Sequence, residues 1–265
     1  YQSVRISLSK VIENDELFGI YGNDCYTSVR FGLFAAEDIT AADGTVIPAD
    51  GLLSEVSLAE NMTAKFDVQI PFGRYYVKEI STDEHYILNG EKYLVNFEYM
   101  GQDIQTVDID CGQFVNLLMR GRIEGHKVDD KSDPLENAVF GLFTADCVKF
   151  SRDTAIMTAA SDENGCFEFT DVPFGQYIVR EIESPSGYIL SDKEYAVSIS
   201  EDGEVIEITA ENKPVTVEIS KRDMYGNELK GAKMQIIDSE GNIVDEWTSD
   251  GTDHIVTKIP VGNYT

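Results

Sequence analysis

Hydrophobic and polar residues alternate along most of this chain of 265 residues, as they do in strands with one buried face. Turn-forming glycine, asparagine and aspartate interrupt the alternation at intervals of roughly 8–12 residues. No window keeps the period of an amphipathic helix. The pattern therefore predicts an all-β fold made of β-sandwiches.

One alternating strand occurs three times in nearly the same form. Each occurrence follows a Pro-x-Gly turn, and the turn prolines are Pro71, Pro173 and Pro260. Pro71 and Pro173 are 102 residues apart, and Glu79 and Glu181, on the strands that follow, have the same separation. Self-similarity at a fixed period indicates tandem copies of one structural unit.

The repeat divides the chain into two complete copies and half of a third. We expect complete domains at residues 1–117 and 118–214, and the N-terminal part of a third domain at residues 215–265. The third copy stops inside its repeated strand, so we expect the sequence to be a fragment of a longer protein. The connections are short and lack Gly/Ser runs, which predicts a semi-rigid array.

The acidic composition narrows the range of partners. The formal net charge is −27, and such a surface repels nucleic acid. Solubility is the simplest explanation of this charge, and cation binding is the alternative. The densest acidic run, residues 129–133, lacks the ligand spacing of a calcium loop. No apolar run is long enough for a membrane span, and no stretch resembles a signal peptide.

The cysteines Cys25, Cys111, Cys147 and Cys166 form no Cys-x-x-Cys pair and no Cys/His cluster in the sequence. We therefore expect no metal site and no cofactor. Cys147 and Cys166 flank one loop of the second copy, and a disulfide between them and two isolated thiols are equal alternatives.

Three polar residues recur in matching registers of the two complete copies. Each copy has a lysine at the end of its first strand, a glutamate on a central strand and an asparagine on its last strand. They are Lys10, Glu79 and Asn116 in copy one, and Lys127, Glu181 and Asn212 in copy two. Each residue alone has an ordinary explanation in solvated strand ends or turns, but a glutamate on the buried face of a strand needs a partner. Their joint recurrence points to shared chemistry.

These copies resemble the collagen-adhesin B-type (CnaB-like, SpaA-like, prealbumin-like) repeats of Gram-positive surface adhesins and pilins. The most specific motifs are residues 211–223, the Tyr-x-x-x-Glu strand and residues 186–190. The resemblance implies tandem Greek-key β-sandwiches. It also implies intramolecular isopeptide bonds between the lysine and the asparagine of each complete copy, with Glu79 and Glu181 as the catalytic groups.

Elementary chemistry is consistent with that reaction. Burial lowers the pKa of a lysine and yields a neutral, nucleophilic amine. Burial also raises the pKa of a glutamate, so that we expect a protonated carboxyl that donates to the amide oxygen. The reaction occurs once per domain, so the chain is not an enzyme in the usual sense. In the third copy the matching glutamate would lie three residues beyond Thr265, so we expect Lys221 to have no intramolecular partner.

The leading functional hypothesis is a structural stalk or shaft of a cell-wall-anchored, extracellular surface adhesin or pilus. Its expected partners are other subunits of a surface fibre, with a host matrix protein or glycan bound through other regions, and neither nucleic acid nor membrane. One alternative is a module that itself binds a host protein or glycan through loops such as residues 13–28 and 38–53. A third is an accessory domain of transthyretin type. Catalysis on an external substrate is disfavoured, because no nucleophile elbow, metal cluster or phosphate loop is present.

Overall fold

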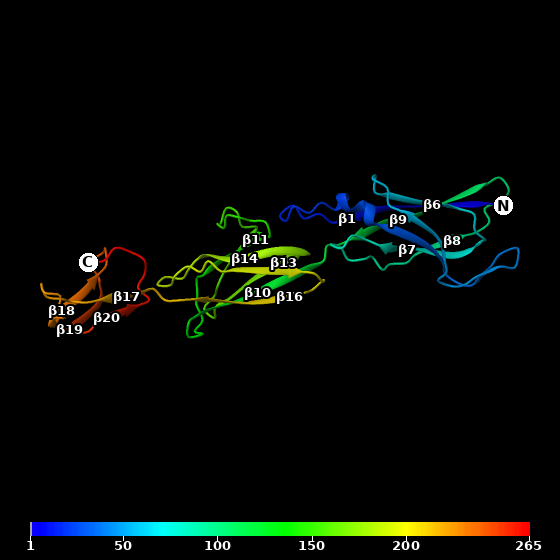
Figure 1. The fold of residues 1–265 in the computed structure, drawn as a ribbon. Coiled ribbons are helices and arrows are strands. Elements are labelled where there is room, and N and C mark those ends of the chain that lie inside the picture. The colour runs from blue at the N-terminus through cyan, green and yellow to red at the C-terminus, as the bar shows by residue number, and fades with distance from the viewer. Residues whose placement is uncertain (1) are drawn as a thin grey trace. The chain divides into compact units, whose positions relative to one another are not determined.

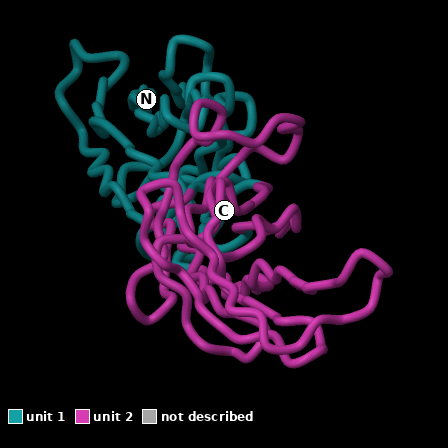
Figure 2. Tube along the Cα trace, turned by 90° about the vertical axis from the view of Figure 1, so that its left-hand side faces the viewer, with its two compact units in different colours: residues 1–120, 173–175, 200–203 teal, residues 121–172, 176–199, 204–265 magenta. Residues whose placement is uncertain are grey.

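The computed structural model describes residues 2–265 and is built almost entirely of strands (Figure 1). The chain divides into two compact units (Figure 2). The first comprises residues 1–120, 173–175 and 200–203, and the second comprises residues 121–172, 176–199 and 204–265. The predicted all-β fold of tandem sandwiches is confirmed, whereas the domain boundaries 1–117, 118–214 and 215–265 remain a prediction.

Copy one is a sandwich of two sheets. The first sheet has the order β6-β1-β9, and the second has the order β5-β2-β7-β8. The strands are β1 (Ser3–Ile12), β2 (Arg30–Ala35), β5 (Leu52–Ser57), β6 (Thr63–Val68), β7 (Gly73–Ser81), β8 (Tyr93–Phe97) and β9 (Thr106–Asn116). A short 3-10 helix, η1 (Gly22–Ser28), and a small hairpin of β3 (Ile39–Thr40) and β4 (Val46–Ile47) lie in the connections.

Copy two repeats this topology strand for strand. Its sheets have the orders β13-β10-β16 and β12-β11-β14-β15. The strands are β10 (Arg120–Asp129), β11 (Val139–Thr144), β12 (Met157–Ala160), β13 (Cys166–Pro173), β14 (Gly175–Glu183), β15 (Glu194–Ile199) and β16 (Val205–Asn212). In both copies the first strand pairs in parallel with the last, so the two ends of the repeat lie side by side in one sheet.

The third copy has only the first strands of this arrangement. They are β17 (Thr216–Ile219), β18 (Lys230–Ile237), β19 (Ile243–Asp250) and β20 (His254–Thr257). β17 pairs with β20 and β18 pairs with β19, all antiparallel. Among the described residues, β17 has no parallel partner of the kind that β1 and β10 have.

The repeated Pro-x-Gly-x-Tyr motif closes its own turn. The hydroxyl of Tyr75 donates to the carbonyl oxygen of Pro71 at 2.7 Å, and Tyr264 donates to the carbonyl oxygen of Pro260 at the same distance. A buried tyrosine needs such a partner for its hydroxyl. The motif thus fixes where the central strand begins and which residues of that strand face inward.

Alternation then decides which side chains of the central strand are buried. Tyr75, Val77 and Glu79 of β7 are all buried, and the matching residues of β14 are buried as well. The expected glutamate on the buried face of the strand is therefore confirmed in both copies. Aromatic rings fill the core around it, with Phe31 and Phe114 in edge-to-face contact in copy one and Phe140 and Phe167 stacked in copy two.

β9 is one continuous strand with an irregularity in its middle. Its register against β1 shifts between Ser7 and Ser9. Gly112, with φ of +73°, lies at this irregularity, where a bulge needs a residue that tolerates the left-handed region. The bulge carries the strand on to Asn116, which pairs with Ile12.

Candidate functional site

In copy one the three predicted residues meet inside the sandwich. Lys10 lies on β1 and Asn116 is the last residue of β9, in the same sheet, whereas Glu79 reaches them from β7 in the facing sheet. Lys10 Nζ lies 2.7 Å from Glu79 Oε1 and donates to Asn116 Oδ1 at 2.6 Å. The side chains of Lys10 and Glu79 are wholly inaccessible to solvent.

Parallel pairing explains why lysine and asparagine meet. Lys10 is opposite Phe114 in the register, and Lys127 is opposite Ala210. The asparagine follows two positions later in each case. Because side chains two positions apart share a face, the asparagine points to the same interior as the lysine.

The carboxylate of Glu79 is held on both of its oxygens. Oε1 lies between Lys10 and Asn116, and it accepts from Asn116 Nδ2 at 3.0 Å. Oε2 accepts from the backbone N–H of Asn89 at 2.8 Å. Asn116 Nδ2 also donates to the hydroxyl of Thr82 at 2.7 Å. The amide and the carboxylate are thereby fixed beside the lysine amine.

Copy two has the same arrangement with looser contacts at the lysine. Asn212 Nδ2 donates to Glu181 Oε1 at 2.8 Å, and Glu181 Oε2 accepts from the backbone N–H of Ser191 at 3.0 Å. Lys127 Nζ lies 3.7 Å from Glu181 Oε1 and donates to the carbonyl oxygen of Ala210 at 3.4 Å. The Oδ1 atom of Asn212 is buried and has no hydrogen-bond partner among the described residues.

Burial shifts the pKa of both lysines and of Glu181. Desolvation lowers the pKa of Lys10 and of Lys127, against the opposing influence of the nearby glutamates. Desolvation also raises the pKa of Glu181, although Lys127 and the hydrogen bonds to its carboxylate act in the other direction. Both shifts in copy two favour a neutral amine beside a neutral carboxyl over an ion pair.

The structure differs from our expectation in the atom that the glutamate contacts. We expected the carboxyl to donate to the amide oxygen, but in both copies its Oε1 atom meets the amide nitrogen of the asparagine. The oxygen of Asn116 instead accepts from Lys10. A carboxyl that touches both the amine and the amide nitrogen is placed to move a proton from the first to the second.

Lys221 is arranged differently from Lys10 and Lys127. Its side chain is exposed, and it follows β17 instead of lying within a strand. The neighbouring Arg222 forms an ion pair with Glu228 at 2.7 Å. The described part of the third copy therefore places no buried glutamate and asparagine beside this lysine.

The cysteines and the acidic run of residues 129–133 were the other candidates from the sequence, and the structure assigns them structural roles or no role. All four cysteines are free thiols, so Cys147 and Cys166 are not bonded to each other. In the acidic run, Asp129 is buried and accepts from the backbone N–H groups of Lys131 and Asp133. Within residues 2–265, no group of three or more histidine, cysteine or acidic side chains could hold a metal ion. No helix in that range is long and apolar enough to cross a membrane.

In each complete copy the lysine, the glutamate and the asparagine form a trio. Sequence reasoning missed the groups that hydrogen-bond to this trio. Asn89 and Ser191, whose N–H groups hold the glutamates, are separated by the same 102 residues as Glu79 and Glu181. The repeat offset could therefore have identified Asn89 and Ser191 as a matching pair. Thr82 had no such signal, because the matching Ser184 donates to the carbonyl oxygen of Tyr188 instead.

Comparison with known proteins identifies a family and a shared fold. A family model described as "SpaA: Prealbumin-like fold domain" matches residues 121–214 and again residues 215–265. A search of curated proteins gave no match. The Bacillus anthracis TIE protein is similar over 100% of this chain and 44% of its own, with 22% identity and a TM-score of 0.61. The present chain thus spans less than half of that structure, and the similarity shows a shared fold.

Two further solved structures resemble the chain at lower TM-scores. A C-terminal fragment of the pilus adhesin SpaC from Lactobacillus rhamnosus GG has 13% identity and a TM-score of 0.48, over 82% of this chain and 99% of that one. GBS52, the minor pilin of Streptococcus agalactiae, has 20% identity and a TM-score of 0.36, over 83% of this chain and 100% of that one.

Proposed function

Because the chain belongs to the SpaA prealbumin-like fold family, we propose that it is a shaft segment of a Gram-positive surface adhesin or pilus. In this proposal it is extracellular and anchored to the cell wall through the full-length protein, and it joins other subunits of a fibre. The proposed domains of this segment are residues 1–117, 118–214 and 215–265. The observation that carries the proposal is the buried Lys–Glu–Asn trio at the same register in two consecutive copies.

In each complete copy the trio closes an isopeptide bond, Lys10–Asn116 and Lys127–Asn212. The glutamate first takes a proton from the lysine, which leaves a neutral amine beside a neutral carboxyl. The amine attacks Cγ of the asparagine, and the carboxyl delivers a proton to the departing amide nitrogen while it takes one from the attacking nitrogen. One C–N bond forms, one C–N bond breaks, and one ammonia leaves.

Fixed geometry supplies most of the rate. The reacting groups lie on three strands of a packed core, so the reaction is effectively unimolecular and benefits from a high effective molarity. Glu79 is anchored by Asn89, and Glu181 is anchored by Ser191. The apolar surroundings, including Phe31 and Phe114 near Lys10 Nζ, exclude the water that would hydrate the amine.

The positions of the bonds suit a load-bearing shaft. Tension that enters copy one at the start of β1 passes along that strand to Lys10, crosses the bond to Asn116 and leaves at the end of β9. Residues 11–115 then carry little of the load. The parallel pairing of β1 with β9 also places their hydrogen bonds in shear, so that several bonds resist the force together.

Single-molecule pulling tests this role. The parent chain, stretched from its two ends, is expected to show no lengthening from residues 11–115. A Lys10→Met variant is expected to release its 106-residue loop in a step of about 350 Å, at roughly 3.3 Å per residue. The same long step in the parent chain would contradict the shaft proposal, because copy one would then unfold under load.

Thr82 offers a test of the proposed proton route. A Thr82→Val variant removes one acceptor from the amide nitrogen of Asn116, so Lys10–Asn116 bond formation is expected to slow by about threefold to tenfold. The rate is measured in freshly translated protein, by following the branched peptide with mass spectrometry. The Lys127–Asn212 bond of the same molecule is the internal reference.

Ser184→Ala is the matched control, because Ser184 has the same register in copy two but donates its hydroxyl to the carbonyl oxygen of Tyr188 and not to Asn212. It is expected to leave the rate of Lys127–Asn212 formation unchanged. Equal rates in the Thr82→Val variant and the parent would show that Thr82 does not position the leaving group.

A further inference from the structure

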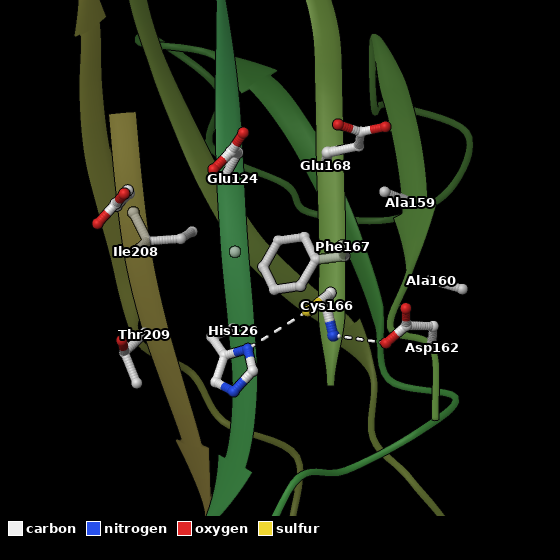
Figure 3. Close-up of a pocket in the computed structure, with 12 residues that line it drawn as sticks. Glu124, His126, Ala159, Ala160, Asp162, Cys166, Phe167, Glu168, Ile208 and Thr209 are labelled. Atoms are coloured by element: carbon white, nitrogen blue, oxygen red, sulfur yellow. Dashed lines mark hydrogen bonds between the residues drawn. The ribbon is translucent and has the colours of Figure 1, made fainter. Parts of the chain in front are cut away.

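The outer face of the β13-β10-β16 sheet carries a cysteine and a histidine that the sequence places 40 residues apart. Alternation buries Phe167 on β13 and Lys127 on β10, so Cys166 and His126 point outward. Their side chains turn toward each other, and Cys166 Sγ lies 3.6 Å from His126 Nδ1 (Figure 3). Both are exposed and lie in a shallow depression of the sheet surface.

The separation of these two atoms is the one that a zinc ion requires. Zn²⁺ binds cysteine sulfur at about 2.3 Å and histidine nitrogen at about 2.0–2.1 Å, in tetrahedral geometry. Two such ligands on one tetrahedral ion are about 3.6 Å apart. A weak S–H···N hydrogen bond gives a similar distance, so the surroundings of the pair must distinguish the two explanations.

The surroundings favour a cation. Glu124, Glu168 and Glu207 line the same depression, from the three strands of the sheet. Glu124 and Glu207 are directly opposite in the β10–β16 register, where two like charges destabilise a sheet. Arg122 offsets part of this charge through its ion pair with Glu124 at 2.9 Å. A divalent ion beside these carboxylates would relieve the remaining repulsion, and the net charge of −27 attracts it.

The backbone around the pair is already fixed. Cys166 donates its N–H to Asp162 Oδ1 at 2.8 Å, and its carbonyl oxygen accepts from the N–H of Asp162 at 2.9 Å. This tight hairpin sets the position of the cysteine, and the β10 strand sets that of His126. Ligands on rigid elements lose little freedom when they bind an ion.

We propose that Cys166 and His126 form a two-ligand surface site for a thiophilic divalent cation of the Zn²⁺ class. Binding converts the thiol to a thiolate, with release of its proton to solvent, and the neutral Nδ1 atom supplies the second ligand. No third protein ligand is arranged around them in the part of the chain that the structure describes, so water completes the tetrahedron. A second copy of so acidic a chain is a poor source of further ligands, because the two copies repel each other.

Co²⁺ is the probe for this site, because it occupies Zn²⁺ sites and gives a near-ultraviolet charge-transfer absorption when a thiolate binds it. Titration of the parent chain, with a phosphine reductant present, is expected to produce this absorption with one Co²⁺ per chain. Two ligands supply about half of a four-ligand zinc site, so the Kd for Zn²⁺ is expected to be on the order of 10–100 µM, and the Kd for Co²⁺ is expected to be higher because Co²⁺ binds such ligands more weakly. Zn²⁺ is expected to displace the Co²⁺ and abolish the absorption.

Three variants locate the site. Cys166→Ser is expected to lose the absorption, and His126→Gln to raise the Kd at least about tenfold. Cys147→Ser is the control, because Cys147 is also a free thiol but its sulfur contacts the carbonyl oxygen of Lys149 and no histidine. It is expected to match the parent chain.

Any of three results would overturn the proposal. The first is the absence of the charge-transfer absorption in the parent chain, and the second is its persistence in Cys166→Ser. The third is an equal Kd for His126→Gln and the parent, which would mean that a thiol alone holds the ion. The site lies on the opposite face of the sheet from the buried trio, and its failure would leave the isopeptide proposal untouched.

Discussion

A Glu181→Gln variant loses one ammonia fewer than the parent chain, because its second copy cannot close the bond between Lys127 and Asn212. Glutamine has nearly the same shape as glutamate, so the packing of the core is preserved. It cannot take a proton from the lysine or deliver one to the departing amide nitrogen, and the lysine stays protonated and unreactive. Intact mass spectrometry of the two purified chains measures the difference directly.

Glu183→Gln is the control for this variant. Glu183 lies two residues further along the same strand, but it is half exposed and pairs with Arg152 on the surface. Its substitution is expected to leave the loss of ammonia unchanged. A Glu181→Gln chain with the same mass deficit as the parent would show that the carboxyl is not needed for the reaction.

Lys127→Met is expected to lower the free energy of unfolding of copy two by about 4–5 kcal/mol. The bond between Lys127 and Asn212 closes a loop of 85 residues, and the chain-entropy model for cross-links assigns this value to such a loop. Methionine fills the space of the wholly buried lysine without its charge, so little of the change comes from a cavity. For a domain of this size the expected decrease in Tm is about 20 °C or more.

Differential scanning calorimetry resolves this effect if copy one is kept as the internal reference. Lys149→Met is the matched control, because Lys149 is exposed on a loop of the same copy. It is expected to change the Tm of neither copy. A decrease of only a few degrees in Lys127→Met would indicate that no covalent cross-link had been lost.

Local periodicity made much of the fold and of the trio predictable. The alternation of Tyr75, Val77 and Glu79 identified a buried carboxylate from three residues of one strand. The repeat offset then linked Glu79 to Glu181, and the strand ends supplied the lysines and the asparagines. These signals depend on side-chain direction within a strand, which the sequence specifies with a period of two.

Contacts between distant strands could not be predicted in the same way. No pattern in the sequence placed His126 beside Cys166, since the pairing of β10 with β13 is set by the whole sandwich. The side-chain contacts within the trio could not be predicted from the sequence either. The contact of the glutamate with the amide nitrogen and the role of Thr82 both depend on rotamers that the packed core selects.

The intact mass of the purified parent chain, under reducing and denaturing conditions, tests the central claim most directly. The account predicts the mass of the sequence less two ammonia molecules, one for Lys10–Asn116 and one for Lys127–Asn212. A mass equal to that of the unmodified sequence would contradict it. The copies would then be ordinary β-sandwiches with a buried polar trio and no covalent bond.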